Sequence, residues 1–135
     1  MVARYSTGSF KDDVGRLLLR FNNSQNFYAA GLGSPSASPV LEITKTVGGS
    51  TSRLCTVPFT ATNGTFYWER VRIQTSGTTA VISARAWANG TAEPTSWQVS
   101  CADNRPLSAG LTGVNGWDGV GIWSLDSYSA GNLGP

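Results

Sequence analysis

Apolar and polar residues alternate along most of the chain with the two-residue period of a β-strand. Residues 15–22 (GRLLLRFN), for example, place three apolar side chains on one face of such a strand: Leu17, Leu19 and Phe21. The pattern predicts about nine or ten short strands, separated at hairpin spacing by turns rich in Gly, Ser, Thr and Asn. We therefore predict one all-β domain over residues 1–135, a two-sheet antiparallel sandwich with a loop-like tail at 129–135.

The segments 66–75 and 79–88 form the central predicted hairpin. Small aliphatic side chains match across the two segments on one face, which we expect to lie in the core: Val71, Ile73, Ile82 and Ala84. The opposite face, here called the aromatic–basic face, carries five side chains that form the candidate site for a glycan or a partner: Trp68, Arg70, Arg72, Arg85 and Trp87. Because strand side chains alternate, these five are expected to lie together.

The turn of this hairpin can be placed in two ways. A turn at residues 76–77 puts Trp68 opposite Arg85, whereas a turn one residue later puts two arginines, Arg70 and Arg85, opposite each other. Like charges across a ladder are unfavourable, and a guanidinium over an indole gains about 0.5–1 kcal/mol or more. We therefore predict the turn at 76–77, although both registers keep the same side chains on the same face.

Two interpretations of the aromatic–basic face remain open. Stacked Trp and Arg side chains often simply cover the second face of a sheet. Alternatively they bind a sugar, because indole faces stack on pyranose rings and Arg side chains fix hydroxyl groups. Nucleic-acid bases could also stack on the indoles, but a nucleic-acid ligand needs a basic surface. Only 13% of the residues are charged, the net charge is +2 and no run of basic residues exists, so this ligand is disfavoured.

Composition argues against several other functions. The chain has no histidine, the usual general base and the commonest transition-metal ligand. No apolar stretch approaches the roughly 18 residues of a membrane span, and the N-terminal segment lacks the pattern of a secretory signal peptide. We expect no nucleic-acid partner and no membrane insertion, and a location on a virion surface or outside the cell that is reached without a signal peptide.

The cysteines and three aspartates are the remaining candidates for covalent or metal chemistry. Cys55 and Cys101 fit no zinc spacing and form either a disulfide or two buried thiols; without an export signal we favour thiols. Calcium has weak candidate ligands in Asp12, Asp13 and Asp126 if the chain ends meet, with solvated turn aspartates as the alternative. We expect no other metal and no organic cofactor.

Residues 85–97 (RAWANGTAEPTSW) combine a basic-x-Trp strand end with a G-x-x-E-P-x-x-W corner. Together with W-x-R-V-R-I at 68–73 and LLLRFNNSQNFYAAGL at 17–32, this corner resembles the concanavalin A-like lectin/glucanase (laminin G-like) jelly rolls. The resemblance extends from about Leu17 to Tyr128 and implies a jelly-roll sandwich. The superfamily includes lectins, hydrolases, adhesins and virion proteins, so the resemblance implies no single function.

Only a short strand precedes Gly15, where such domains usually have further strands. One sheet edge is therefore expected to be open or completed by a partner.

The corner itself has a physical rationale. Gly90 permits the turn after the strand, and Pro94 fixes the direction in which the chain leaves it. We expect Trp97 to pack back over the hairpin near Trp87. We interpret Glu93 as a structural residue that accepts hydrogen bonds from backbone amides or from an arginine.

Catalysis is not indicated. The glycoside hydrolases of this superfamily use two carboxylates, about 5–5.5 Å apart in retaining enzymes, which neighbouring same-face residues of a strand supply. No two acidic residues of this chain are two positions apart, and no G-x-S-x-G motif is present.

We therefore predict a non-catalytic structural module on the surface of an assembly, such as a capsid decoration or tail-associated protein of a phage virion. Its partners would be the protein subunits of that assembly and, in an adhesive role, a cell-surface glycan; a homo-oligomer is also compatible with the sequence. The alternative is a stand-alone carbohydrate-binding, lectin-like module, and a glycoside hydrolase is the least favoured.

Overall fold

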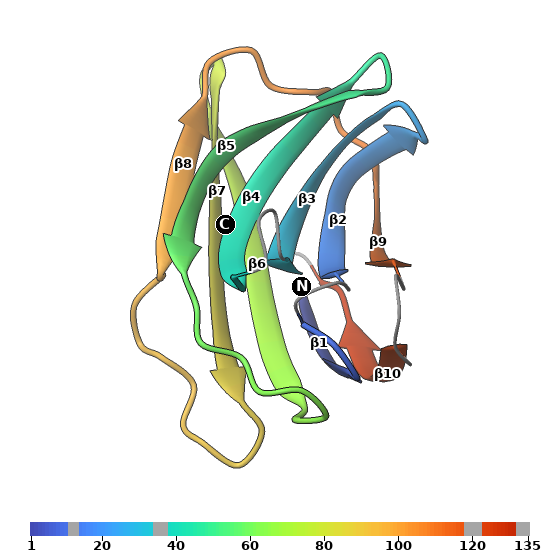
Figure 1. Ribbon diagram of the computed structural model, residues 1–135. Coiled ribbons are helices and arrows are strands. Elements are labelled where there is room, and N and C mark those ends of the chain that lie inside the picture. Colours follow the sequence, from blue (N-terminus) through green and yellow to red (C-terminus); the bar gives the residue numbers. More distant parts are fainter. Residues whose placement is uncertain (11–13, 34–37, 118–122, 132–135) are drawn as a thin grey trace.

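The computed structural model describes residues 1–10, 14–33, 38–117 and 123–131, and it confirms the all-β prediction (Figure 1). In these ranges the chain forms strands and turns without a helix. There are ten described strands: β1 (Val2–Thr7), β2 (Val14–Asn23), β3 (Asn26–Gly33), β4 (Val40–Val47), β5 (Ser50–Pro58), β6 (Tyr67–Ser76), β7 (Thr79–Ala88), β8 (Val99–Asp103), β9 (Leu111–Trp117) and β10 (Trp123–Ser129).

The strands form two antiparallel sheets of five strands each, as the sandwich prediction requires. One sheet has the order β10-β1-β6-β7-β8 and the other the order β5-β4-β3-β2-β9. In Figure 1 the two sheets lie as separate layers, with β8 beside β5 at one end of the sandwich and β10 beside β9 at the other. Between these ends, β7 contacts β4, β6 contacts β3 and β1 contacts β2.

The core lies between the two sheets. On the central hairpin, Val71, Ile82 and Ala84 are buried as predicted, while Ile73 packs against the core as a partly buried side chain. From the other sheet, Leu41 and Ile43 are fully buried against them. The two-residue alternation therefore identified the inward face of the hairpin correctly.

Strand β2 departs from simple alternation. Leu17 and Leu19, which were predicted to share a face, are both buried, but the pairing register shifts after Leu19, and Arg20 adopts a positive φ of 48°. A bulge of this kind adds one residue to a strand and reverses the facing of the residues after it. Phe21 is consequently only half-buried and packs on the ring of Phe27, so the prediction that it shares one face with Leu17 and Leu19 is wrong.

A disulfide joins the two sheets at one end of the sandwich. Cys55 on β5 is bonded to Cys101 on β8, with 6.2 Å between their Cα atoms. The prediction of buried thiols is therefore wrong. The two cysteines are 46 positions apart, and only the stacking of β8 on β5 brings them within disulfide range.

Candidate functional site

The structure brings the five residues of the aromatic–basic face together. They lie on the outer face of β6 and β7, opposite the buried side chains, and each is half-buried: Trp68, Arg70, Arg72, Arg85 and Trp87. They form a continuous surface two strands wide. Their grouping was predictable because both strands keep a strict two-residue alternation.

The register of the hairpin differs from the prediction. The turn comes one residue later, with Gly77 at φ 59°, so Trp68 pairs with Trp87 and Arg70 pairs with Arg85. The two indoles are nearly parallel, with an interplanar angle of 14° and 6.3 Å between ring centroids. The two arginines lie side by side on neighbouring strands, which requires a compensating negative charge.

Glu93 supplies that charge. It lies in the loop after β7, and its Oε1 accepts a hydrogen bond from Arg70 Nε at 2.6 Å and forms an ion pair with Arg85. Partial burial by itself would raise the pKa of Glu93. The hydrogen bonds and positive charges of Arg70 and Arg85 outweigh this effect and leave the pKa below its ordinary value. The role expected for Glu93, acceptance from an arginine, is confirmed.

Replacing Glu93 by Gln should lower the free energy of unfolding by about 1 kcal/mol at neutral pH, because two like charges then face each other across the ladder. The depressed pKa of Glu93 means that its stabilisation is present above the ordinary value of 4.5 and is lost as the pH falls through the folded-state pKa. Urea unfolding of both proteins at about pH 7 and about pH 3 measures this effect. The difference in unfolding free energy between the parent and the variant should be smaller at about pH 3 than at about pH 7. A Glu93→Gln variant as stable as the parent at neutral pH contradicts the assignment.

Trp97 completes the face by folding back from the loop between β7 and β8. The guanidinium carbons of Arg72 and Arg85 lie 4.8 Å and 4.7 Å from its ring centroid. The sequence predicted that Trp97 returns to the hairpin, but it placed the ring near Trp87. In the structure two arginines hold the indole by cation–π contacts.

Two further residues of the face were missed. Arg4 on β1 pairs with Trp68, and its guanidinium lies 5.0 Å from the Trp68 ring and 5.7 Å from the Phe66 ring. Asn89 Oδ1 accepts hydrogen bonds from Trp68 Nε1 and Arg4 Nη1, both at 3.0 Å. Arg4 also pairs with Asp126 on β10. The face therefore extends over β1, and its cations are held in place by neighbouring acids and rings.

The calcium prediction receives no support from the described residues. Asp12 and Asp13 lie outside the described residues, and Asp126 is paired with Arg4. In the described ranges no three His, Cys, Asp or Glu side chains lie close enough together to hold a metal ion.

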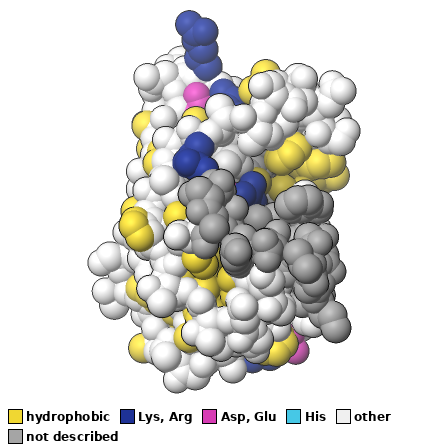
Figure 2. Space-filling view, viewed as in Figure 1, with side chains coloured by type: hydrophobic (Ala, Val, Ile, Leu, Met, Phe, Trp, Pro, Cys, Tyr) yellow, Lys and Arg dark blue, Asp and Glu magenta, His cyan; other side chains and the backbone are white. Residues whose placement is uncertain are grey.

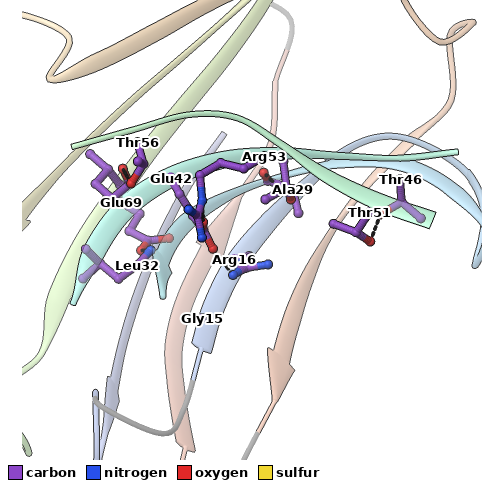
Figure 3. A network of polar contacts seen from close by, with 12 residues as sticks. Gly15, Arg16, Ala29, Leu32, Glu42, Thr46, Thr51, Arg53, Thr56 and Glu69 are labelled. Carbon is purple, nitrogen blue, oxygen red and sulfur yellow. Dashed lines mark hydrogen bonds and ion pairs between the residues drawn. The ribbon is translucent and has the colours of Figure 1, made fainter. Parts of the chain in front are cut away.

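A second polar cluster, which the sequence did not single out as a site, lies in the core. Glu69 on β6 is buried, and its Oε1 accepts hydrogen bonds from the Tyr5 hydroxyl at 2.7 Å and from the Leu32 amide at 2.6 Å. Figure 3 shows Glu69 beside Leu32, with Gly15 and Arg16 close by. Burial raises the pKa of Glu69 to about 8, although its hydrogen bonds and the charge of Arg16 act in the opposite direction.

Other described carboxylates are also paired. Glu42 is buried on β4 between Arg16 and Arg53, and its Oε2 lies 2.8 Å from Arg53 Nε (Figure 3). Asp103 lies 2.7 Å from Lys45 Nζ. On the face shown in Figure 2, Lys and Arg side chains form separate spots, and a few Asp or Glu side chains lie beside them. Charge on that view of the surface is therefore sparse.

Comparisons of the chain with protein-family models, with curated proteins and with solved structures each find no match. The described residues form strands and turns, so among them there is no helix that could span a membrane.

Proposed function

We propose that the protein is a non-catalytic module on the surface of an assembly, and that this assembly is a phage virion which it decorates on the capsid or the tail. The observation that carries the proposal is the aromatic–basic face. Trp and Arg are the residues most enriched among the side chains that dominate protein–protein binding energy. Here they form one partly exposed surface whose arginines are held by Glu93, Asp126 and the indoles. A surface fixed in this way loses little side-chain entropy on binding.

The disulfide supports a location outside the reducing cytosol. Cys55 and Cys101 are bonded, and such bonds persist mainly in oxidising surroundings such as virion and cell surfaces. A subunit on the outside of a particle also benefits from a covalent link between its two sheets.

The strand order supports a jelly roll of the concanavalin A-like type. The first strand lies between β6 and β10, and β2 lies between β3 and β9, so strands far apart in the sequence are neighbours in both sheets. Chains that cross between two antiparallel sheets in this manner are typical of jelly rolls. In such a fold the aromatic–basic face occupies the outside of one sheet.

Binding to a particle can be tested by co-sedimentation of the purified chain with virions that lack it. We expect Trp68→Ala and Trp87→Ala each to weaken binding by about tenfold or more, as loss of a central Trp does at protein interfaces. Val81→Ala is the matched control. Val81 is an exposed apolar side chain on the same outer side of β7 as Trp87, but it lies nearer the turn, opposite Gln74, and is not one of the five residues of the face, so its variant should bind like the parent.

A stable monomer that binds neither virions nor their isolated subunits contradicts the proposal. Equal binding by all three variants contradicts the assignment of the surface.

Glycan binding is a second candidate function, which the geometry of Trp68 and Trp87 favours. Their nearly parallel indoles lie side by side and offer the flat apolar surface on which pyranose rings stack. A glycan array and retardation on polysaccharide gels test it, with the same two Trp variants and Val81→Ala as control. If no glycan is retained, or if the Trp variants bind as the parent does, this candidate fails.

A further inference from the structure

The two sheets are held together by different devices along the width of the sandwich. At one end, Cys55 and Cys101 link β5 to β8 covalently. Toward the other end, Tyr5 on β1 and Glu69 on β6 reach across the core to the backbone of β2 and β3. The strand orders place these polar contacts two to three strands away from the disulfide.

Two glycines in the second sheet form notches that receive these side chains. A Cβ atom on Gly15 would lie 2.2 Å from the Tyr5 ring. A Cβ atom on Gly31 would lie 2.5 Å from Glu69 Oε2. Both distances are far below any van der Waals contact. In these notches the Tyr5 hydroxyl lies 3.1 Å from the Gly15 carbonyl oxygen, and Glu69 Oε1 accepts from the Leu32 amide. The contact is thus built for a tyrosine and a carboxyl group.

The carboxyl group of Glu69 is not fully satisfied in this position. Its Oε2 is buried and has no hydrogen-bond partner in the described part of the chain. An ionised carboxylate with one unsatisfied oxygen costs much more free energy in a dry core than the neutral acid does. The raised pKa of Glu69 agrees with this geometry.

We propose that Tyr5 and Glu69 form a pH-sensitive latch between the two sheets, which is closed when Glu69 is protonated and loosens locally when it ionises, while the disulfide keeps the far end of the sandwich shut. The latch would control the docking of β1 and β6 on β2 and β3. It is a property of the fold and does not depend on what the aromatic–basic face binds.

The charged and titratable groups around the latch come from three strands. Tyr5 faces Glu69 from β1, and burial raises its pKa well above 10, so it stays neutral throughout. Arg16 on β2 attracts the ionised form of Glu69, but Arg16 is itself paired with Glu42 on β4. These neighbours reduce the effect of burial on Glu69 without cancelling it.

The direction of the pH dependence follows from proton binding. The folded chain keeps a proton on Glu69 up to about pH 8, whereas the unfolded or opened chain releases it near the ordinary value of 4.5. The stabilisation is therefore complete below about pH 4.5 and is lost progressively as the pH rises toward 8, above which it levels off. Each pH unit in this window raises the ratio of opened to closed chain by at most about tenfold.

Amide hydrogen exchange of the parent and a Glu69→Gln variant tests the latch. Expressed as protection factors, which remove the intrinsic pH dependence of exchange, the Leu32 amide of the parent should lose up to about tenfold per pH unit between about pH 5 and pH 8. The variant should show no such loss. Amides of β5 and β8 beside the disulfide should keep their protection in both proteins. If the parent and the variant share one pH dependence, or if β5 and β8 lose protection together with Leu32, the latch is excluded.

A direct titration keeps the test decisive even when Glu69→Gln folds poorly. The carboxyl ¹³C resonance of Glu69 in the intact chain should titrate near pH 8. In Tyr5→Phe the ring still fills the Gly15 notch, but the hydrogen bond that favours ionisation is gone, so the midpoint should move upward. A midpoint near 4.5 in the parent, or an unchanged midpoint in Tyr5→Phe, overturns the proposal.

Discussion

A chain in which Cys55 and Cys101 are both replaced by serine should lose about 4 kcal/mol of unfolding free energy, the largest effect that we expect from any change described. The disulfide closes a loop between residues 46 positions apart. In the chain-entropy account, removing the bond raises the conformational entropy of the unfolded chain, and this lowers the free energy of unfolding by the stated amount. It also releases β5 and β8, the edge strands that the bond joins. Denaturant unfolding of the oxidised parent and the variant measures the loss.

Reduction provides the matched control for this prediction. The parent in a strong reductant should reproduce the stability of the double serine variant, and the variant itself should not respond to the reductant. A difference of less than about 1 kcal/mol between the oxidised parent and the variant would show that packing of β8 on β5 holds this end without the bond.

Gly15→Ala should cost about 3 kcal/mol, the second largest effect, because the new methyl group has no space. Its Cβ would lie 2.2 Å from one ring atom of Tyr5 and 2.3 Å from the next. Tyr5 is buried and its hydroxyl is held by Glu69, so the ring cannot simply swing away. Gly113→Ala on the neighbouring strand β9 is the matched control, since its Cβ would make only an ordinary contact of 3.9 Å with Leu18.

A double-mutant cycle identifies the cause of that loss. In a Tyr5→Leu background the ring is absent, and Gly15→Ala should then cost much less than in the parent. Thermal or urea unfolding of the four proteins gives the interaction energy. If Gly15→Ala lowers the unfolding free energy equally in both backgrounds, or if Gly113→Ala lowers it as much, the Tyr5 ring does not fill the space beside Gly15.

The sequence predicted the parts of the fold that depend on local alternation. Val71 and Ile82 lie inward and Trp68 and Trp87 outward because side chains on a strand alternate whatever lies beyond it. The register of that same hairpin could not be predicted in this way. Repulsion between Arg70 and Arg85 argues against the observed register, and the residue that removes this repulsion, Glu93, lies in the loop after the hairpin.

Apart from the local bulge in β2 that turns Phe21 away from Leu17 and Leu19, the remaining errors concern contacts between segments that only the tertiary fold brings together. Cys55 and Cys101 pair because two sheets stack, which no spacing reveals. Arg4 joins the candidate site because β1 pairs with β6. A signal for Glu69 was nevertheless present, since an acidic residue alternates with Tyr67 and Val71 on the apolar side of its strand. A buried acid among apolar neighbours indicates a specific polar partner.

The position of β1 also determines the order in which the chain can fold. β1 is the first strand in the sequence, yet it lies inside its sheet between β6 and β10. Its contacts with these strands include Tyr5–Glu69, 64 positions apart, and Arg4–Asp126, 122 positions apart. Contacts between such distant residues form late and slow folding. During synthesis β1 therefore keeps one edge unpaired until β10 has been made, and in this period the growing chain is exposed to aggregation.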